Sequence, residues 1–440
     1  MDGAISTAPP RLSPFHRRLW KFAVLVSLFL VTLIIAGPLL SPNKAANRFA
    51  IGNDFLPFYT AGQYLRTGRA HQLYDPIALT ATEQQTARDA GSPMAPGAIG
   101  AWLNPPFAAL PAVALARLPY ETALTLWMGF LLACLICAIA VLVRMLPSPR
   151  TWQHWALIPL LMFTSLPVWQ AALHGQNTFF SLLVIACSVA CWRRGEMFWA
   201  GVLAGLMLFK PQLGLIFGLV LVACEGRTAL GGLLVSASAL LLVNLVVLPG
   251  TLNDFVSLMP QHLQQVQIQT RYTWFRHVTW LAFWRVLLQG HVGALPNVAT
   301  KLCAILCGLG TAAYLAIGVM RMRGRRECRD RIIAATIVTT PLLMPYFMDY
   351  DLTLLAVAAV LCTADALRSG RTPSISIAWV VLYGIVETNI IIAGHFRFVP
   401  VVPALLCLSV VLIHHAIRDA ESLGKTQDKT PDAVLLPLAA

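Results

Sequence analysis

The chain has 440 residues, of which 58% are hydrophobic and only 12% are charged. Soluble domains contain roughly 45 to 50% apolar and about 25% charged residues, so the composition excludes a set of soluble domains. It also excludes a disordered chain, a disulfide-stapled secreted module and a nucleic-acid binder. Several uncharged runs approach the roughly 20 residues with which a helix spans a bilayer. The formal net charge of +13 is then informative through its distribution along the chain. We predict an all-α polytopic membrane protein.

Four basic residues precede an uncharged run from Phe22 to Leu40. This run is longer than the roughly 7 to 15 residues of a signal-peptide core, so we expect a membrane helix that is retained. Because Lys and Arg are enriched in cytoplasmic flanks, residues 1–21 are expected in the cytoplasm. Further spans are predicted at residues 122–143, 155–173, 178–192, 228–248, 302–320, 332–348, 352–364, 373–393 and 398–417, separated on one side by short arginine-rich connectors.

The apolar stretch from Met197 to Cys224 is interrupted by Lys210-Pro211-Gln212. A single crossing here would place the cluster from Arg321 to Arg331 outside, against the positive-inside rule. We therefore expect the chain to enter, turn at Lys210-Pro211 and return, since proline disfavours helix at the preceding residue. The count becomes 12 crossings within a domain of residues 22–417. Residues 41–120 and 249–297 form extracytoplasmic loops, and residues 278–288 form a short interfacial or re-entrant helix. The tail, 418–440, is cytoplasmic.

This topology gathers the unusual polar residues on the outer face. Such convergence at one surface indicates an extracytoplasmic active site, because a transporter needs its polar groups near the midplane. The candidate site residues are Asp54, His174, Gln176, Lys210, Gln212, Arg271, Arg276, His277, Asp349 and Asp351.

Several short motifs in this set resemble glycosyltransferase family 87, whose members are membrane transferases that use polyprenyl-phosphate sugars. The resemblance runs in order over roughly residues 20 to 365. It is carried by Gly52-Asn53-Asp54-Phe55, Leu73-Tyr74-Asp75-Pro76, Asn104-Pro105-Pro106-Phe107, His174-Gly175-Gln176-Asn177, the run from Ala200 to Gly205 into Lys210-Pro211-Gln212, and Asp349-Tyr350-Asp351-Leu352.

The resemblance implies a GT-C fold, a helical bundle whose long first outer loop carries an acidic residue and short amphipathic helices. It implies an inverting sugar transfer from a polyprenyl-phosphate donor to a lipid or glycan acceptor, at the outer face of a bacterial inner membrane. The position that matches the catalytic base is Asp54. A carboxylate within hydrogen-bond reach of a hydroxyl takes its proton as the new bond forms. The alternative role of Asp54 is an N-cap of the next helix.

The basic candidates also have two interpretations. Lys210 is the one basic residue inside its apolar stretch, where a charge is costly and usually functional. As a point charge it suits a leaving phosphate, although it could instead snorkel to the interface. Arg271, Arg276 and His277 offer the same contact or belong to an interfacial aromatic belt. His174 is either a substrate contact or a helix-end histidine.

Asp349-Tyr350-Asp351 has the D-x-D spacing with which nucleotide-sugar transferases hold a metal. Because Asp351 would cap the helix from Leu352, we expect capping or hydroxyl recognition, and neither a bound metal nor a cofactor. The expected partners are the lipid-linked donor, the acceptor and membrane lipids, without nucleic acid. A transporter or lipid-carrier flippase is the alternative function, since residues 197–224 could form a discontinuous helix. However, no internal repeat supplies the corresponding break.

Overall fold

The computed structural model describes residues 14–40, 52–91, 94, 99–100, 102–148, 150, 152–268, 272–291, 294–369 and 373–427. Within these ranges every regular element is helical, and one isolated bridge pairs His277 with Met348. Six helical segments of the described chain are long and apolar enough to cross a membrane, or seven if the bent pair α7 and α8 is one span. They are α6 (Tyr120–Met145), α12 (Arg227–Val247), α15 (Val298–Met322), η7 with α17 (Asp349–Leu354, Leu355–Ser369), α18 (Pro373–His395) and α19 (Val401–Gln427). The protein is therefore a helical membrane protein, and the count of 12 crossings is not confirmed.

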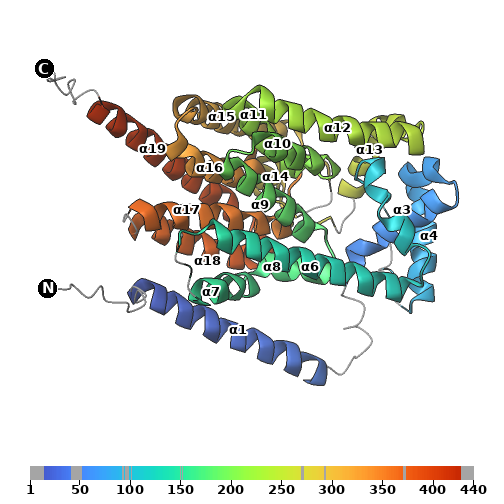
Figure 1. Ribbon diagram of the computed structural model, residues 1–440. Helices are drawn as coiled ribbons and strands as arrows, with labels where there is room; N and C mark the ends of the chain where they lie inside the picture. The colour runs from blue at the N-terminus through green and yellow to red at the C-terminus, as the bar shows by residue number, and fades with distance from the viewer. Residues whose placement is uncertain are drawn as a thin grey trace, which may run out of the picture.

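The central helices run between two ends of the bundle (Figure 1). The hydroxyl of Thr178, at the start of α9 (Thr178–Arg194), bonds to Asp351. The other end of α9 carries Arg193, which pairs with Asp330 at the start of α16 (Arg329–Leu343). We call these the aspartate end and the arginine end. The predicted outer motifs collect at the aspartate end, and several predicted cytoplasmic connectors collect at the arginine end.

The chain reverses direction at Lys210. α10 (Met197–Leu206) and η4 (Met207–Phe209) lead toward the aspartate end, and α11 (Pro211–Glu225) leads back. α11 ends at the arginine end, because Glu225, its last residue, accepts a hydrogen bond from Nε1 of Trp192 at 2.6 Å. The predicted turn at Lys210-Pro211 is thus confirmed. α12 has Gly232 where it packs on α10, and a Cβ at this position would collide with the carbonyl oxygen of Phe198. The close approach of the two helices therefore needs glycine here.

Short helices build a module at the aspartate end, seen at the right of Figure 1. Buried aromatic side chains hold it together, among them Tyr64, Tyr74 and Trp102. The ring of Tyr74 also lies 5.8 Å from that of Phe255 in the second predicted loop. The elements are η1 (Asn53–Phe55), α3 (Leu56–Arg66), η2 (Ala70–Tyr74), α4 (Pro76–Asp89), η3 (Pro106–Ala109) and α5 (Ala112–Leu115), joined by α13 (Thr251–Gln267). The next elements in the chain are η5 (Trp274–Arg276) and α14 (Trp280–Gln289), and α14 lies nearer the middle of the bundle (Figure 1). Residues 41–120 and 249–297 thus contain short helices where they are described, and their assignment as extracytoplasmic loops stays a prediction.

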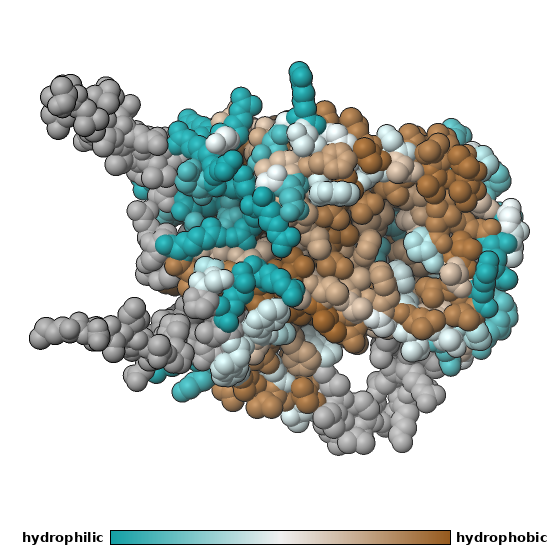
Figure 2. All heavy atoms as spheres, in the orientation of Figure 1, coloured by the Kyte–Doolittle hydropathy of each residue, from teal (hydrophilic) through white to brown (hydrophobic). Residues whose placement is uncertain are grey.

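The remaining elements are α1 (Pro14–Leu40), α7 (Trp152–Phe163), α8 (Leu166–His174) and η6 (Arg326–Cys328). α7 and α8 meet at 70°. Glu387 of α18 accepts a hydrogen bond from the backbone N–H of Leu166 at 2.7 Å, satisfying a donor that the break leaves without a helical partner. Hydrophobic side chains cover the middle of the face in Figure 2, whereas hydrophilic ones gather most densely at the left, where the arginine end lies.

Candidate active site

Two glycines bring the segment containing Asp54 against the end of α8. Gly52 (φ +80°) donates its N–H to the carbonyl of Leu173 at 2.6 Å. Gly175 (φ +69°) ends α8 in the left-handed conformation, and a Cβ there would lie 3.1 Å from the Cα of Gly52. Trp127 of α6 donates from Nε1 to the carbonyl of Gly175 at 2.8 Å. The close backbone approach, which needs glycine, sets η1 beside the residues that follow α8.

The carboxylate of Asp54 is positioned by side chains from this second segment. Its Oδ2 accepts a hydrogen bond from Nε2 of Gln176 at 2.5 Å and lies 3.9 Å from Nδ1 of His174. The side chain is 37% exposed, so it is accessible to a ligand. The capping interpretation is wrong: Asp54 lies inside η1, the N-cap of α3 is Phe55, and neither element has a side-chain cap. The Asp54 carboxylate is therefore fixed by a hydrogen bond from Gln176 and partly exposed to solvent.

Arg276 connects this carboxylate group to the D-x-D motif. Its guanidinium donates to Asp349 through two nitrogens, Nε to Oδ2 at 3.0 Å and Nη2 to Oδ1 at 2.9 Å. Its Nη1 lies 3.3 Å from Nε2 of His174. Because arginine only donates, Nε2 of His174 accepts, and the proton of a neutral ring then sits on Nδ1, the nitrogen that faces Asp54. Burial lowers the pKa of Arg276, but the bonds to Asp349 outweigh it and the pKa is raised. Arg276 is therefore charged.

Lys210 forms a second, deeper ion pair. Its Nζ donates to Asp351, at 2.9 Å from Oδ1 and 3.3 Å from Oδ2, and Thr178 donates to the same Oδ1 at 2.6 Å. The Lys210 and Asp351 side chains are 7% and 2% exposed. The ring of Tyr350, between the two aspartates in sequence, lies 5.4 Å from Nζ of Lys210 and 5.9 Å from the guanidinium carbon of Arg276. η7 is thus held by two opposite-charge pairs whose cations both lie within 6 Å of the same aromatic ring.

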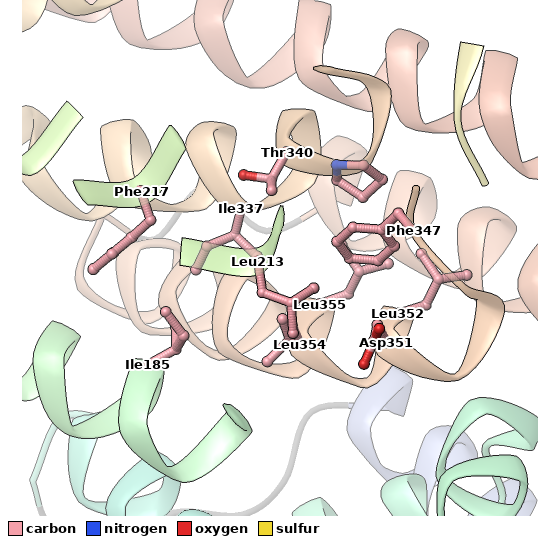
Figure 3. A pocket seen from close by; sticks show the side chains of 11 residues that line it. Ile185, Leu213, Phe217, Ile337, Thr340, Phe347, Asp351, Leu352, Leu354 and Leu355 are labelled. Atoms are coloured by element: carbon pink, nitrogen blue, oxygen red, sulfur yellow. The ribbon is translucent and has the colours of Figure 1, made fainter. Parts of the chain in front are cut away.

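A small cavity beside Asp351 is lined mainly by apolar side chains, including Ile185, Phe217 and Phe347 (Figure 3). Its volume of about 10 Å³ suffices for at most about one water molecule. A sugar does not fit there. The half-exposed group around Asp54 is therefore the better candidate for substrate contact than the buried interior around Asp351.

The other three predicted residues, Gln212, His277 and Arg271, are not seen to take part in the Asp54 group in the residues that the structure describes. Gln212 lies half-buried in the first turn of α11, and among the described residues no side-chain hydrogen bond joins it to the Asp54 group. His277 is 2% exposed and packs on the rings of Tyr272 and Tyr346, with centroids 5.2 and 4.7 Å away. Burial lowers the pKa of His277 to about 3, so the ring is neutral and packs as an aromatic group. Arg271 lies outside the described residues.

Sequence reasoning missed two participants. Oε1 of Gln170 accepts from Nη2 of Arg276 at 3.4 Å. If the oxygen and nitrogen of this amide are exchanged, the nitrogen instead donates to Oδ1 of Asp349 at 3.0 Å. Its position four residues before His174 puts both on one face of α8, and this spacing could have revealed it. Thr178 carried no comparable signal, because its contact with Asp351 joins segments that are far apart in the chain.

The two aspartates of the D-x-D motif face different cations, Asp349 toward Arg276 and Asp351 toward Lys210. They do not form a shared carboxylate pair. Within the described part of the chain, no group of three or more His, Cys, Asp or Glu side chains is arranged to hold a metal ion. The expectation that the protein uses no metal or cofactor stays a prediction.

Comparison with known proteins identifies a matching family. Glycosyltransferase family 87 matches residues 102–345, which include His174, Gln176, Lys210 and Arg276. Asp54 and the D-x-D aspartates lie outside the matched segment. Neither the curated proteins nor the solved structures include a match. The family match spans more than half of the 440 residues, so the chain belongs to glycosyltransferase family 87.

Proposed function

We propose that the protein is an inverting, GT-C-type glycosyltransferase that moves a sugar from a polyprenyl-phosphate donor to a lipid or glycan acceptor. The reaction takes place at the extracytoplasmic face of a bacterial inner membrane, with both termini in the cytoplasm. The observation that supports this most directly is the half-exposed carboxylate of Asp54, which accepts a hydrogen bond from Gln176. The ring of His174 lies between this carboxylate and the charged guanidinium of Arg276.

Asp54 is the proposed general base. Oδ2 is occupied by Gln176, whereas no hydrogen bond from the described residues reaches Oδ1. The acceptor hydroxyl donates to Oδ1 and transfers its proton as its oxygen bonds to the anomeric carbon. The bond between that carbon and the phosphate oxygen breaks from the opposite face, and its electron pair leaves with the polyprenyl phosphate. Attack opposite the leaving group inverts the anomeric centre.

Arg276 is the proposed contact for the donor phosphate. Its side chain is 14% exposed and lies next to His174, whereas Lys210 is more deeply buried. Asp349 accepts from two nitrogens of Arg276 and fixes the plane of the guanidinium. The second N–H of Nη1, beside the one that faces His174, is left to donate to a phosphate oxygen. Lys210, paired with Asp351 and 5.4 Å from the Tyr350 ring, is the second, deeper cation proposed to act on the phosphate. His174 and Gln170 lie against Arg276 and support it, and Gln212 and His277 are proposed to contribute from neighbouring positions.

The transporter alternative loses its main support in this structure. It relied on residues 197–224 as one discontinuous membrane helix, and these residues instead turn at Lys210 and return to the arginine end.

The test compares two aspartates of the same module. Asp54→Asn keeps the size of the side chain and removes the base, so we expect transfer from a polyprenyl-phosphate sugar to fall by at least about 10²-fold. Asp75→Asn is the matched control, because Asp75 caps α4 through the N–H groups of Ile77 and Ala78 and asparagine caps equally well.

Product formation is measured by mass spectrometry with purified protein in lipid nanodiscs. Wild-type activity in the Asp75→Asn variant, with a large loss in the Asp54→Asn variant, supports the assignment. Transfer by the Asp54→Asn variant within a few fold of wild type would refute it.

A further inference from the structure

A cavity lined by arginines lies at the arginine end, far from Asp54. It has a volume of about 550 Å³ and is bordered by five arginines, Glu327 and Asp330. The 17 residues of α9 separate it from Thr178 at the aspartate end, a distance of roughly 25 Å at 1.5 Å per residue. The proposed sugar transfer uses none of these residues.

Three of the arginines are fixed by the fold. Asp330 is shared by Arg193 and Arg368, with Nε to Oδ1 at 3.0 Å and Nη2 to Oδ2 at 3.1 Å. Arg329 donates from Nη1 to the carbonyls of Trp192 and Arg193, at 3.0 and 3.2 Å. Two guanidinium groups around one carboxylate leave a net positive charge, and their fixed orientation reduces the entropy lost when an anion binds.

The other two arginines, Arg194 and Arg326, are exposed. Among the described residues neither has an acidic partner within ion-pair distance. The lining residues carry five positive and two negative charges, and Glu225, 3.8 Å from Nε of Arg329, brings the excess to two positive charges. Arginine guanidinium groups bind phosphate oxygens in a two-pronged manner, and a volume of several hundred Å³ is typical of small-ligand sites.

Apolar side chains beside the cavity indicate where its ligand comes from. Phe198 and Trp199 follow the lining residue Met197 and are 38% and 58% exposed, and Leu367, before Arg368, is 39% exposed. Exposed aromatic and aliphatic groups next to arginines are typical of a membrane interface. These neighbours are those expected of a cavity at the level where lipid headgroups and acyl chains meet, and basic pockets between membrane helices suit anionic headgroups.

We propose that this arginine cavity binds a phosphate group, presented by an anionic phospholipid in the leaflet on the arginine side of the membrane. Arg193, Arg329 and Arg368 form the fixed floor. Arg194 and Arg326 close on the headgroup, and the acyl chains lie along α10 and α17. A soluble diphosphate offers the same chemistry from the aqueous side, and the experiment distinguishes the two sources.

The experiment removes the two unpaired charges. The variant Arg194→Gln/Arg326→Gln is compared with Arg321→Gln/Arg323→Gln, which removes the same charge from exposed positions at the end of α15, outside the cavity. Binding of phosphatidylglycerol and of phosphatidylcholine to each purified protein is counted by native mass spectrometry. Inorganic pyrophosphate is titrated by calorimetry in a second arm.

We expect the cavity variant to lose at least about tenfold in affinity for phosphatidylglycerol, while the control keeps wild-type affinity. A tenfold loss for pyrophosphate alone would keep the phosphate site and assign it to a soluble ligand. Equal losses in both variants would indicate general attraction to a basic surface and overturn the proposal. Unchanged binding of both ligands, or equal retention of phosphatidylcholine and phosphatidylglycerol, would overturn it as well.

Discussion

Asp54 and Asp75 show how backbone placement decides the role of a residue type. Asp75 has an extended backbone just before α4, so its carboxylate turns back onto the N–H groups of the first helical turn. Asp54 already lies inside a helical turn, where those groups point away from it, and its carboxylate meets Gln176. Capping preference alone predicts the same role for both. The difference arises from Gly52, whose left-handed conformation turns the chain before η1.

Lys210 and Asp351 allow structural and catalytic roles to be separated. Replacing Lys210 by Met leaves a buried, unpaired carboxylate, so we expect a loss of roughly 3 to 5 kcal/mol in stability. The double variant Lys210→Met/Asp351→Asn removes both charges, keeps an acceptor for Thr178 and should recover most of this loss. Thermal unfolding of the purified proteins measures it, with the exposed Lys301→Met as the control.

Sugar transfer by the double variant then tests the donor contact. If Lys210 acts on the phosphate, the double variant should have recovered stability but a kcat/KM for the donor at least about tenfold below that of wild type. Recovery of both stability and transfer would show that Lys210 is purely structural.

At the scale of single elements, α4 contains a buried carboxyl group, one of whose oxygens has no hydrogen-bond partner among the described residues. This group is Glu83, which is 2% exposed and whose Oε1 is the oxygen without a partner in the described chain. Burial raises the pKa of Glu83 from 4.5 to about 8. The folded module therefore holds a proton that the unfolded chain releases above its lower pKa. Stability from this group is full below about pH 4.5 and is lost as the pH rises toward 8.

This linkage predicts a pH-dependent gain from Glu83→Gln. At pH 7 the penalty on the ionisable group is roughly 3 kcal/mol, so the variant should unfold at a higher temperature than wild type at pH 7 to 8. Near pH 4.5 the two proteins should have similar Tm values. Glu121→Gln, at an exposed position in the first turn of α6, is the control. A Tm difference between Glu83→Gln and wild type that does not change with pH would contradict the assignment.

At the scale of the whole molecule, the two ends of the bundle predict its orientation. The arginine end carries the positive-inside signal, so it should face the cytoplasm and the module should face outward. In a protein whose native cysteines have been replaced, Ala90→Cys should react with an impermeant maleimide on intact cells. Arg323→Cys should react only after permeabilisation. The reverse pattern would place the proposed active site in the cytoplasm.

The sequence by itself determined the class of the protein, the turn at Lys210-Pro211 and the family, because hydropathy, proline and short motifs act locally. The number of crossings was not settled in this way, since several central helices, such as α10 and α11, are shorter than a full span. Only the tertiary structure paired Arg276 with Asp349 and Lys210 with Asp351, and showed Asp54 as an open carboxylate instead of a cap. These contacts join segments that are distant in the chain, and their energies depend on burial and geometry that no local pattern encodes.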